Sequence, residues 1–143
     1  DAMAVFISRA LAEGDPNVPP GPATATFTDV PTDYWAYRYV EYAVAHNIVG
    51  GYGPGIYAPL VVVTRDQMAV FVARGLAGGD SAVPSGPAVA AFSDVPTTHW
   101  AFRYVEFCRA EGVVGGFGDG TYRPGLSVTR DQMAVFIRRA FLP

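Results

Sequence analysis

Apolar residues recur along this chain at the spacing of a helix face. Ala36, Tyr39, Val40 and Ala43 fall at positions i, i+3, i+4 and i+7, which one side of an α-helix brings together. The same pattern returns later in the chain at Ala101, Tyr104, Val105 and Cys108. The hydrophobic periodicity therefore predicts two equivalent amphipathic helices, and it places the thiol of Cys108 in the core.

Both copies of this helix have predicted ends. Thr32 and Thr97 are the expected N-caps, because a side-chain hydroxyl there accepts a hydrogen bond from a backbone N–H of the first turn. Asn47 and Gly112 follow the last apolar residues, and these two residue types best tolerate the left-handed conformation that ends many helices. We therefore expect the helices to stop at Asn47 and Gly112.

A second helix pattern occurs three times. Two copies open with Thr-Arg-Asp-Gln, in which Thr64 and Gln67, or Thr129 and Gln132, form a capping-box pair. The apolar stripe comprises Met3, Phe6, Ile7 and Ala10, then Met68, Phe71, Val72 and Leu76, and then Met133, Phe136, Ile137 and Ala140. Further apolar surface on another side comes from Val5, Val70 and Val135. We expect an all-α, loop-rich fold with pseudo-threefold symmetry, in which these three helices form a central bundle and the Trp-bearing helices lie outside it.

The two helix patterns belong to one repeat of 65 residues. Residues 27–32 return nearly unchanged at 92–97, and residues 64–71 return identically at 129–136. A fixed period of this size indicates a repeat architecture. The predicted organisation is a helix of a truncated first repeat at 1–13, a linker at 14–26, a second repeat at 27–77, a linker at 78–91 and a third repeat at 92–143.

The two linkers are rich in Gly, Pro and Ala and poor in charge. Such segments are expected to run over the surface as extended, partly stiff connectors. They are long for loops of a compact domain, which fits the end of one repeat being carried around to the next.

Composition narrows the classes of function. Half of the residues are hydrophobic, which is enough for a packed core. The net charge is −3 and all ten basic residues are Arg, so the clustered positive surface of a nucleic-acid-binding protein is not expected. No apolar run approaches the roughly 20 residues of a membrane-spanning helix. The single Cys excludes an internal disulfide framework and a Cys-rich metal site.

The ordered motifs resemble those of the S-layer homology module. They are Phe-x-Asp-Val-Pro, Trp-Ala, a helix, Gly-Gly-aromatic, Gly-x-Gly-x-Tyr-x-Pro and Thr-Arg-x-x-Met-Ala, and they cover all of the chain except the linkers. The resemblance implies an extracellular, non-enzymatic module without a cofactor, which anchors secreted proteins non-covalently to the bacterial cell envelope. The implied partner is a secondary cell-wall polysaccharide linked to peptidoglycan, often bearing ketal-linked pyruvate, in grooves between repeats.

The resemblance assigns a glycan-contacting role to Arg65 and Arg130, the Arg of the family's Thr-Arg-Ala-Glu motif. Here Gln67 and Gln132 replace the Glu, which keeps the capping function and removes a negative charge. An Arg fork beside free N–H groups at a helix start suits a carboxylate such as a pyruvate ketal. The alternative is a surface Arg paired with a neighbouring acid.

Aromatic and glycine residues complete the candidate site. Trp35 and Trp100 are expected to be buried anchors, with sugar stacking as the alternative. Tyr52 and Phe117 lie between glycines in turns and are better exposed candidates for sugar contact. Backbone N–H donors for a ligand, or only the freedom to make the turn, are expected from Gly50, Gly51, Gly115 and Gly116.

No catalytic or metal-binding constellation is apparent. Asp29 and Asp94 occupy equivalent places in the repeats, so nothing separates an acid from a base as a glycosidase requires. We expect each of them to close a local Asx turn onto the following helix. The alternative to glycan anchoring is a structural or assembly module that packs against other protein chains in a surface layer or filament.

Overall fold

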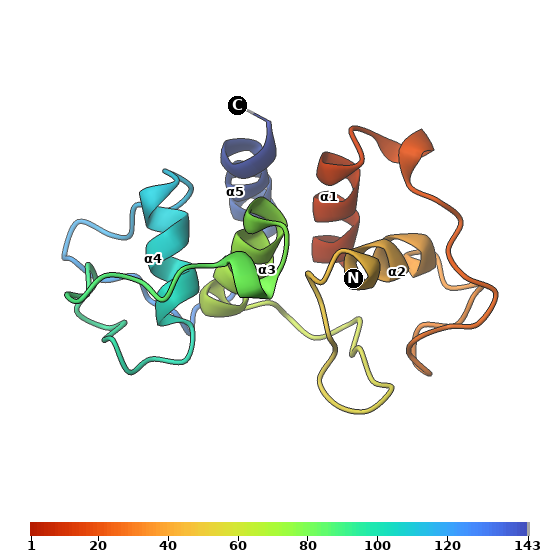
Figure 1. Ribbon diagram of the computed structural model, residues 1–143, viewed down its shortest axis with the longest axis horizontal. Helices are drawn as coiled ribbons and strands as arrows, with labels where there is room; N and C mark the ends of the chain where they lie inside the picture. Colours follow the sequence, from red (N-terminus) through yellow and green to blue (C-terminus); the bar gives the residue numbers. More distant parts are fainter. Residues whose placement is uncertain (143) are drawn as a thin grey trace. The chain divides into compact units, whose positions relative to one another are not determined.

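The computed structural model describes residues 1–142, which form five α-helices and two short 3₁₀ helices without a β-strand. The α-helices are α1 (Ala2–Leu11), α2 (Tyr37–Ala45), α3 (Arg65–Ala77), α4 (Phe102–Ala110) and α5 (Arg130–Phe141), and the 3₁₀ helices are η1 (Asp15–Asn17) and η2 (Asp80–Ala82) (Figure 1). The predicted all-α, loop-rich fold is therefore confirmed.

The chain forms two compact units, Asp1–Val61 and Val62–Pro143. In the first unit α1 packs against α2, and in the second α3 packs against both α4 and α5. Since α1 and α3 are equivalent helices of successive repeats, each unit joins the last helix of one repeat to the first helix of the next. The predicted bundle of three equivalent helices, like the predicted repeat boundaries, stays a prediction.

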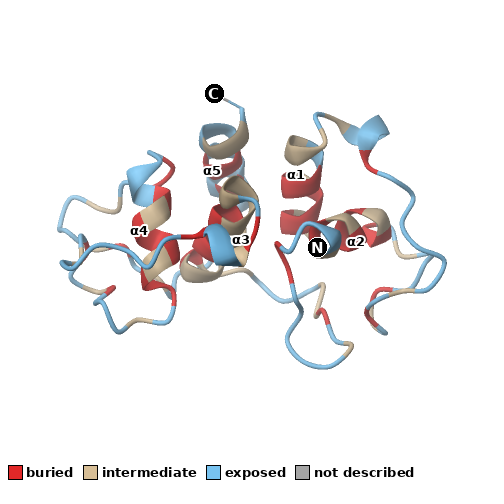
Figure 2. Ribbon diagram, in the orientation of Figure 1, coloured by how far each residue is buried: buried red, intermediate tan, exposed pale blue. Residues whose placement is uncertain are grey.

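Both units have helical cores with a buried polar contact between two helices. The Ser8 hydroxyl of α1 donates to the Tyr39 carbonyl of α2 at 2.8 Å. In the second unit the Cys108 thiol of α4 donates to the Ala69 carbonyl of α3 at 3.5 Å, so the predicted core position of Cys108 is confirmed. Figure 2 shows the buried residues on the helices and mostly exposed residues along the connecting segments.

The observed ends of the helices agree in part with the ends predicted from the sequence. The capping box of Thr64 and Gln67 is formed, with the Thr64 N–H donating to the Gln67 side chain at 3.2 Å. Asn47 and Gly112 have φ values of 56° and 74°, so the predicted left-handed helix stops are confirmed. Val135 differs from its buried counterparts in the other copies and is exposed.

The predicted N-caps at Thr32 and Thr97 are wrong, because α2 begins only at Tyr37 and α4 at Phe102. In the first unit two successive turns precede the helix, with the Tyr34 N–H donating to the Pro31 carbonyl at 2.9 Å. Residues 33–36, which the sequence pattern predicted to form the first helical turn, lie in these turns instead.

Trp35 and Trp100 lie in these turns, and the expectation that they are buried anchors is wrong. Their exposed fractions are 61% and 59%. The following residues, Ala36 and Ala101, are completely buried. The turn therefore directs the small residue to the core and the indole outward.

Each linker is clamped where it begins. Asp80 accepts hydrogen bonds from Tyr104 at 2.6 Å, Arg74 at 2.7 Å and Arg103 at 2.7 Å. The hydrogen bond from Tyr104 and the adjacent guanidinium groups lower the pKa of the Asp80 carboxyl to about 2. In the first unit Asp15 makes the equivalent contacts with Arg9 and a tyrosine hydroxyl. Beyond the clamps the linkers run over the surface, as predicted.

Candidate functional site

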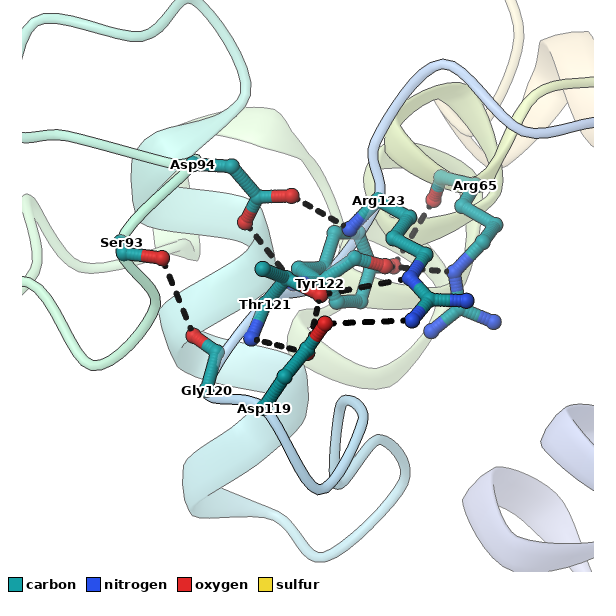
Figure 3. A network of polar contacts seen from close by, with 8 residues as sticks. All are labelled: Arg65, Ser93, Asp94, Asp119, Gly120, Thr121, Tyr122 and Arg123. Carbon is teal, nitrogen blue, oxygen red and sulfur yellow. Dashed lines mark hydrogen bonds and ion pairs between the residues drawn. The ribbon is translucent and has the colours of Figure 1, made fainter.

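The aromatic turn of the second unit comprises residues 115–123, and the carboxylate of Asp94 holds it in place. Asp94 accepts the backbone N–H of Tyr122 and that of Arg123, both at 2.8 Å (Figure 3). Arg123 has a φ of 58°, a left-handed conformation that is costly for a side chain with a Cβ atom. The two charge-assisted hydrogen bonds therefore hold the chain in a shape it would otherwise avoid.

The first unit repeats this clamp. Asp29 accepts the N–H of Tyr57 at 2.9 Å and that of Ala58 at 2.7 Å, and Ala58 also has a φ of 58°. The prediction of a local Asx turn is wrong, because both carboxylate oxygens bond to residues far along the chain. Desolvation of Asp29 opposes these hydrogen bonds, and the net effect lowers the pKa of its carboxyl.

The second glycine of each Gly-Gly pair is needed for the turn itself. Gly116 has a φ of 68°, and a Cβ atom there would lie 2.3 Å from the Phe92 ring and 2.8 Å from the Thr121 carbonyl oxygen. Gly51 is confined in the same way. Gly50 and Gly115 are exposed with open space around them, so they stay the candidates for contact with a ligand.

Arg65 connects α3 to this turn. It is only 6% exposed, and its Nε donates to the Tyr122 carbonyl at 2.8 Å while the Tyr122 hydroxyl donates to the Arg65 carbonyl at 2.8 Å. Burial raises the pKa of Tyr122 well above its usual range, so the hydroxyl keeps its proton and remains a donor. The reciprocal pair fixes the arginine stem against the turn.

Three aromatic rings surround the Arg65 guanidinium. Its Cζ lies 4.6 Å from the ring centroid of Tyr122, 5.0 Å from that of Phe117 and 5.5 Å from that of Phe136. These distances are within the range of cation–π attraction, which stabilises the buried charge without using its N–H donors.

The two Nη nitrogens of Arg65 are free. No hydrogen bond or ion pair from them occurs among residues 1–142. Arg38 Nε is the one side-chain polar atom in that range that is both buried and without a partner. Since the Nη atoms of Arg65 are not fully buried atoms of this kind, they keep some access to solvent. The alternative prediction, an Arg65 paired with a neighbouring acid, is wrong.

The free N–H groups expected beside Arg65 are absent from this site. The Arg65 N–H donates to the Leu126 carbonyl at 2.9 Å, and the Asp66 N–H donates to the Pro124 carbonyl at 3.0 Å. The start of α3 is thus closed by the segment that follows the aromatic turn. The guanidinium of Arg65, and not the start of α3, therefore keeps N–H donors without a partner among residues 1–142.

A second arginine, which the sequence reasoning missed, lies against the same turn. The Arg123 Cζ is 3.9 Å from the Phe117 ring centroid, its Nη2 is 3.2 Å from Asp119, and its Nε donates to Thr121 Oγ1 at 3.3 Å. Hydrogen bonds from Thr121 and Arg123 lower the pKa of Asp119. The available signal was that Arg123 stands where the other repeat has Ala58.

The structure brings together only some of the predicted site residues. Arg65 lies beside the ring of Phe117, which directly follows Gly115 and Gly116 in the next repeat. Arg130 is exposed at the start of α5, and no side-chain hydrogen bond, ion pair or ring contact involves it within residues 1–142. The first unit contains Gly50, Gly51, Trp35 and Tyr52, and the Tyr52 side chain is 57% exposed. The position equivalent to Arg65 in this repeat would precede Asp1.

The arrangement is chemically suited to an acceptor group, because guanidinium donors lie over aromatic rings. A planar fork of N–H donors matches the two oxygens of a carboxylate. No group of His, Cys, Asp and Glu that would hold a metal ion occurs in the described part of the chain.

Comparisons with known proteins identify the family of the chain. The family model of the S-layer homology domain matches residues 26–69 and 91–134. The cellulosome-anchoring protein of Acetivibrio thermocellus is 28% identical over 139 residues, which cover 97% of this chain and 31% of that protein. A cell surface protein of Thermoanaerobacter kivui is 35% identical over 118 residues, covering 82% of this chain and 16% of that protein.

The outer membrane protein SlpA of Thermus thermophilus is 45% identical over 64 residues, covering 45% of this chain and 7% of that protein. The chain thus spans less than a third of the length of each of these relatives. No helix within residues 1–142 has the length and apolar character needed to cross a membrane. The family match and the cell-surface relatives place the chain outside the cell, in association with the cell envelope. The chain belongs to the S-layer homology family.

Proposed function

We propose that this chain is a non-catalytic anchor that holds its protein to the cell envelope by binding a secondary cell-wall polysaccharide. Arg65 is the principal contact, and the glycan is one that bears an acidic group such as a pyruvate ketal. Phe117, Trp100 and the backbone of Gly115 are further candidate contacts in the second unit. Arg130 is a candidate for a separate contact.

The observation that carries the proposal is the free, solvent-reaching Nη pair of an otherwise buried Arg65. A guanidinium held by the Tyr122 carbonyl and by three aromatic rings loses little conformational entropy when a ligand binds. The family match and the name of the cellulosome-anchoring relative support an anchoring role.

The test is co-sedimentation of the purified chain with cell-wall sacculi, before and after their polysaccharide has been removed with hydrofluoric acid. The wild-type chain is expected to pellet only with untreated sacculi. Arg65→Lys keeps the charge and the stem but loses the planar fork, so binding is expected to weaken about tenfold or more.

Arg138→Ala is the matched control. Arg138 is an exposed arginine of α5 without a side-chain contact among residues 1–142, and its loss should leave sedimentation unchanged. Circular dichroism establishes that each variant keeps its helices. The proposal is wrong if wild-type chain stays in the supernatant, or if Arg65→Lys sediments as the wild type does.

A second candidate function, packing against other protein chains in a surface layer or filament, has one observation in its favour. The segment after the first aromatic turn exposes three consecutive apolar residues, Leu60 at 85%, Val61 at 52% and Val62 at 61%. Sedimentation of the chain without sacculi separates the two functions, because only assembly produces large particles there.

A further inference from the structure

The site in the second unit has a cationic residue that the first unit lacks. Arg123 and Arg65 both place their Cζ within 5.0 Å of the Phe117 ring centroid. The equivalent of Arg123 in the first unit is Ala58, which has the same φ of 58°. Two guanidinium groups therefore share one ring in the second unit, and Figure 3 shows both beside the turn of residues 119–123.

The backbone of Arg123 is fixed, whereas the polar contacts of its side chain are exposed. Its N–H is bound by Asp94 at 2.8 Å. Its guanidinium is 3.2 Å from Asp119, and the two side chains are 45% and 54% exposed. An exposed ion pair of this kind contributes little stability. A ligand anion can accept hydrogen bonds from Arg123 and from the free Nη groups of Arg65 at the same time. Asp119 contacts only Arg123 of these two arginines. We therefore expect Arg123 to bind the ligand anion more strongly than it binds Asp119.

We propose that Arg123 is a specificity-determining residue of this site, which turns from Asp119 to the ligand and selects a glycan bearing a compact oxyanion, either a carboxylate or a phosphate. Asp119 acts as an intramolecular competitor that limits the affinity. The inference rests on the proposed function and adds to it the residue that discriminates acidic from neutral glycan.

The test is a nuclear magnetic resonance titration of the whole chain with three probes. They are methyl galactoside carrying a 4,6-linked pyruvate ketal, the methyl ester of the same compound, and galactose 6-phosphate. Arg123→Ala is expected to bind the oxyanion probes about tenfold more weakly and the ester unchanged. Alanine is a safe replacement for folding, because Ala58 holds the same backbone conformation in the first unit.

Asp119→Asn gives the opposite result. Removal of the competing carboxylate is expected to tighten binding of the oxyanion probes about threefold. In the double variant Arg123→Ala, Asp119→Asn this gain should vanish. A gain of the same size without Arg123 means that Asp119 acts only through its general charge, and the competition is then refuted.

The proposal is overturned if Arg123→Ala binds the oxyanion probes like wild type, if the ester binds as well as the acid, or if neither oxyanion probe binds wild-type chain. Binding of the ketal alone or of the phosphate alone supports it and identifies the source of the oxyanion. If Arg123→Ala leaves binding of the probes unchanged while Arg65→Lys releases the chain from sacculi, the proposed anchoring function is retained and only the role of Arg123 is refuted. If Arg65→Lys also has no effect, both fail.

Discussion

At the scale of single residues, Asp29 and Asp94 each fix the path of a distant turn through two backbone hydrogen bonds. Each holds a non-glycine residue at positive φ directly before a proline, where the following ring disfavours helical backbone angles. The left-handed conformation costs roughly 1–2 kcal/mol for a residue with a Cβ atom. Two charge-assisted hydrogen bonds to each carboxylate offset this cost.

Ala58→Gly is therefore expected to stabilise the first unit. Glycine removes the left-handed strain but adds freedom to the unfolded chain, so the net gain is about 0.5–1 kcal/mol, or a few degrees in Tm. Urea unfolding monitored by circular dichroism measures it. Ala10→Gly inside α1 is the control and should cost about 1 kcal/mol. Equal destabilisation by both variants would show that Ala58 is unstrained.

At this scale the position of Arg65 at a helix start could be predicted from the sequence, whereas the role of the aspartates could not. Arg65 lies in a recognisable capping motif, so its position at a helix start was predictable. The partners of Asp94, however, are 28 and 29 positions away, and no local pattern reveals them. The exposure of Trp100 was also unpredictable, because a turn and not a helix face sets its direction.

At the scale of elements, the Asp80 clamp joins α3, η2 and α4. The pKa of this carboxyl in the folded chain, about 2, lies below the value of about 3.9 in an unfolded chain. The clamp therefore contributes its full stabilisation above a pH of about 4, and it loses that stabilisation as the pH falls through about 2.

Asp80→Asn tests this contribution. Since the carboxyl is 44% exposed, solvent screening limits the expected loss at pH 6 to about 0.5–1 kcal/mol. The difference between variant and wild type should shrink as the pH falls from 5 to 2, as measured by urea unfolding. Asp33→Asn alters an exposed aspartate without a hydrogen bond among residues 1–142, and it is the control that should leave the stability at pH 6 unchanged. A pH-independent effect of Asp80→Asn would contradict the clamp.

The helices themselves were largely predictable, because apolar periodicity and capping residues are local signals. The starts of α2 and α4 were not, since the preceding turns are stabilised by backbone hydrogen bonds that any residue can make.

At the scale of the whole molecule, each folded unit takes helices from two successive repeats. The sequence revealed the period but not this pairing, because a period is the same wherever the repeat is taken to begin. The buried Cys108 lies in the contact between α3 and α4 and so reports on the integrity of the second unit.

The Cys108 thiol is expected to resist labelling until that unit opens. Burial raises its pKa to about 12, so almost no thiolate is present at pH 8. Reaction with Ellman's reagent should be about a thousandfold slower in the native chain than in urea. Moving the thiol by Cys108→Ala with Ala43→Cys gives the matched reporter of the first unit. Fast labelling of native chain would disprove the protection.

The pairing of helices across repeats also constrains how such a protein can change in length. A gain or loss of one complete period leaves every junction between an Arg-bearing helix and its aromatic turn intact, wherever the cut falls. A change of any other size within a period separates an arginine from its rings and an aspartate from its turn. Duplication and recombination can therefore lengthen or shorten the array freely in whole steps, and each added step supplies one more candidate anchor point.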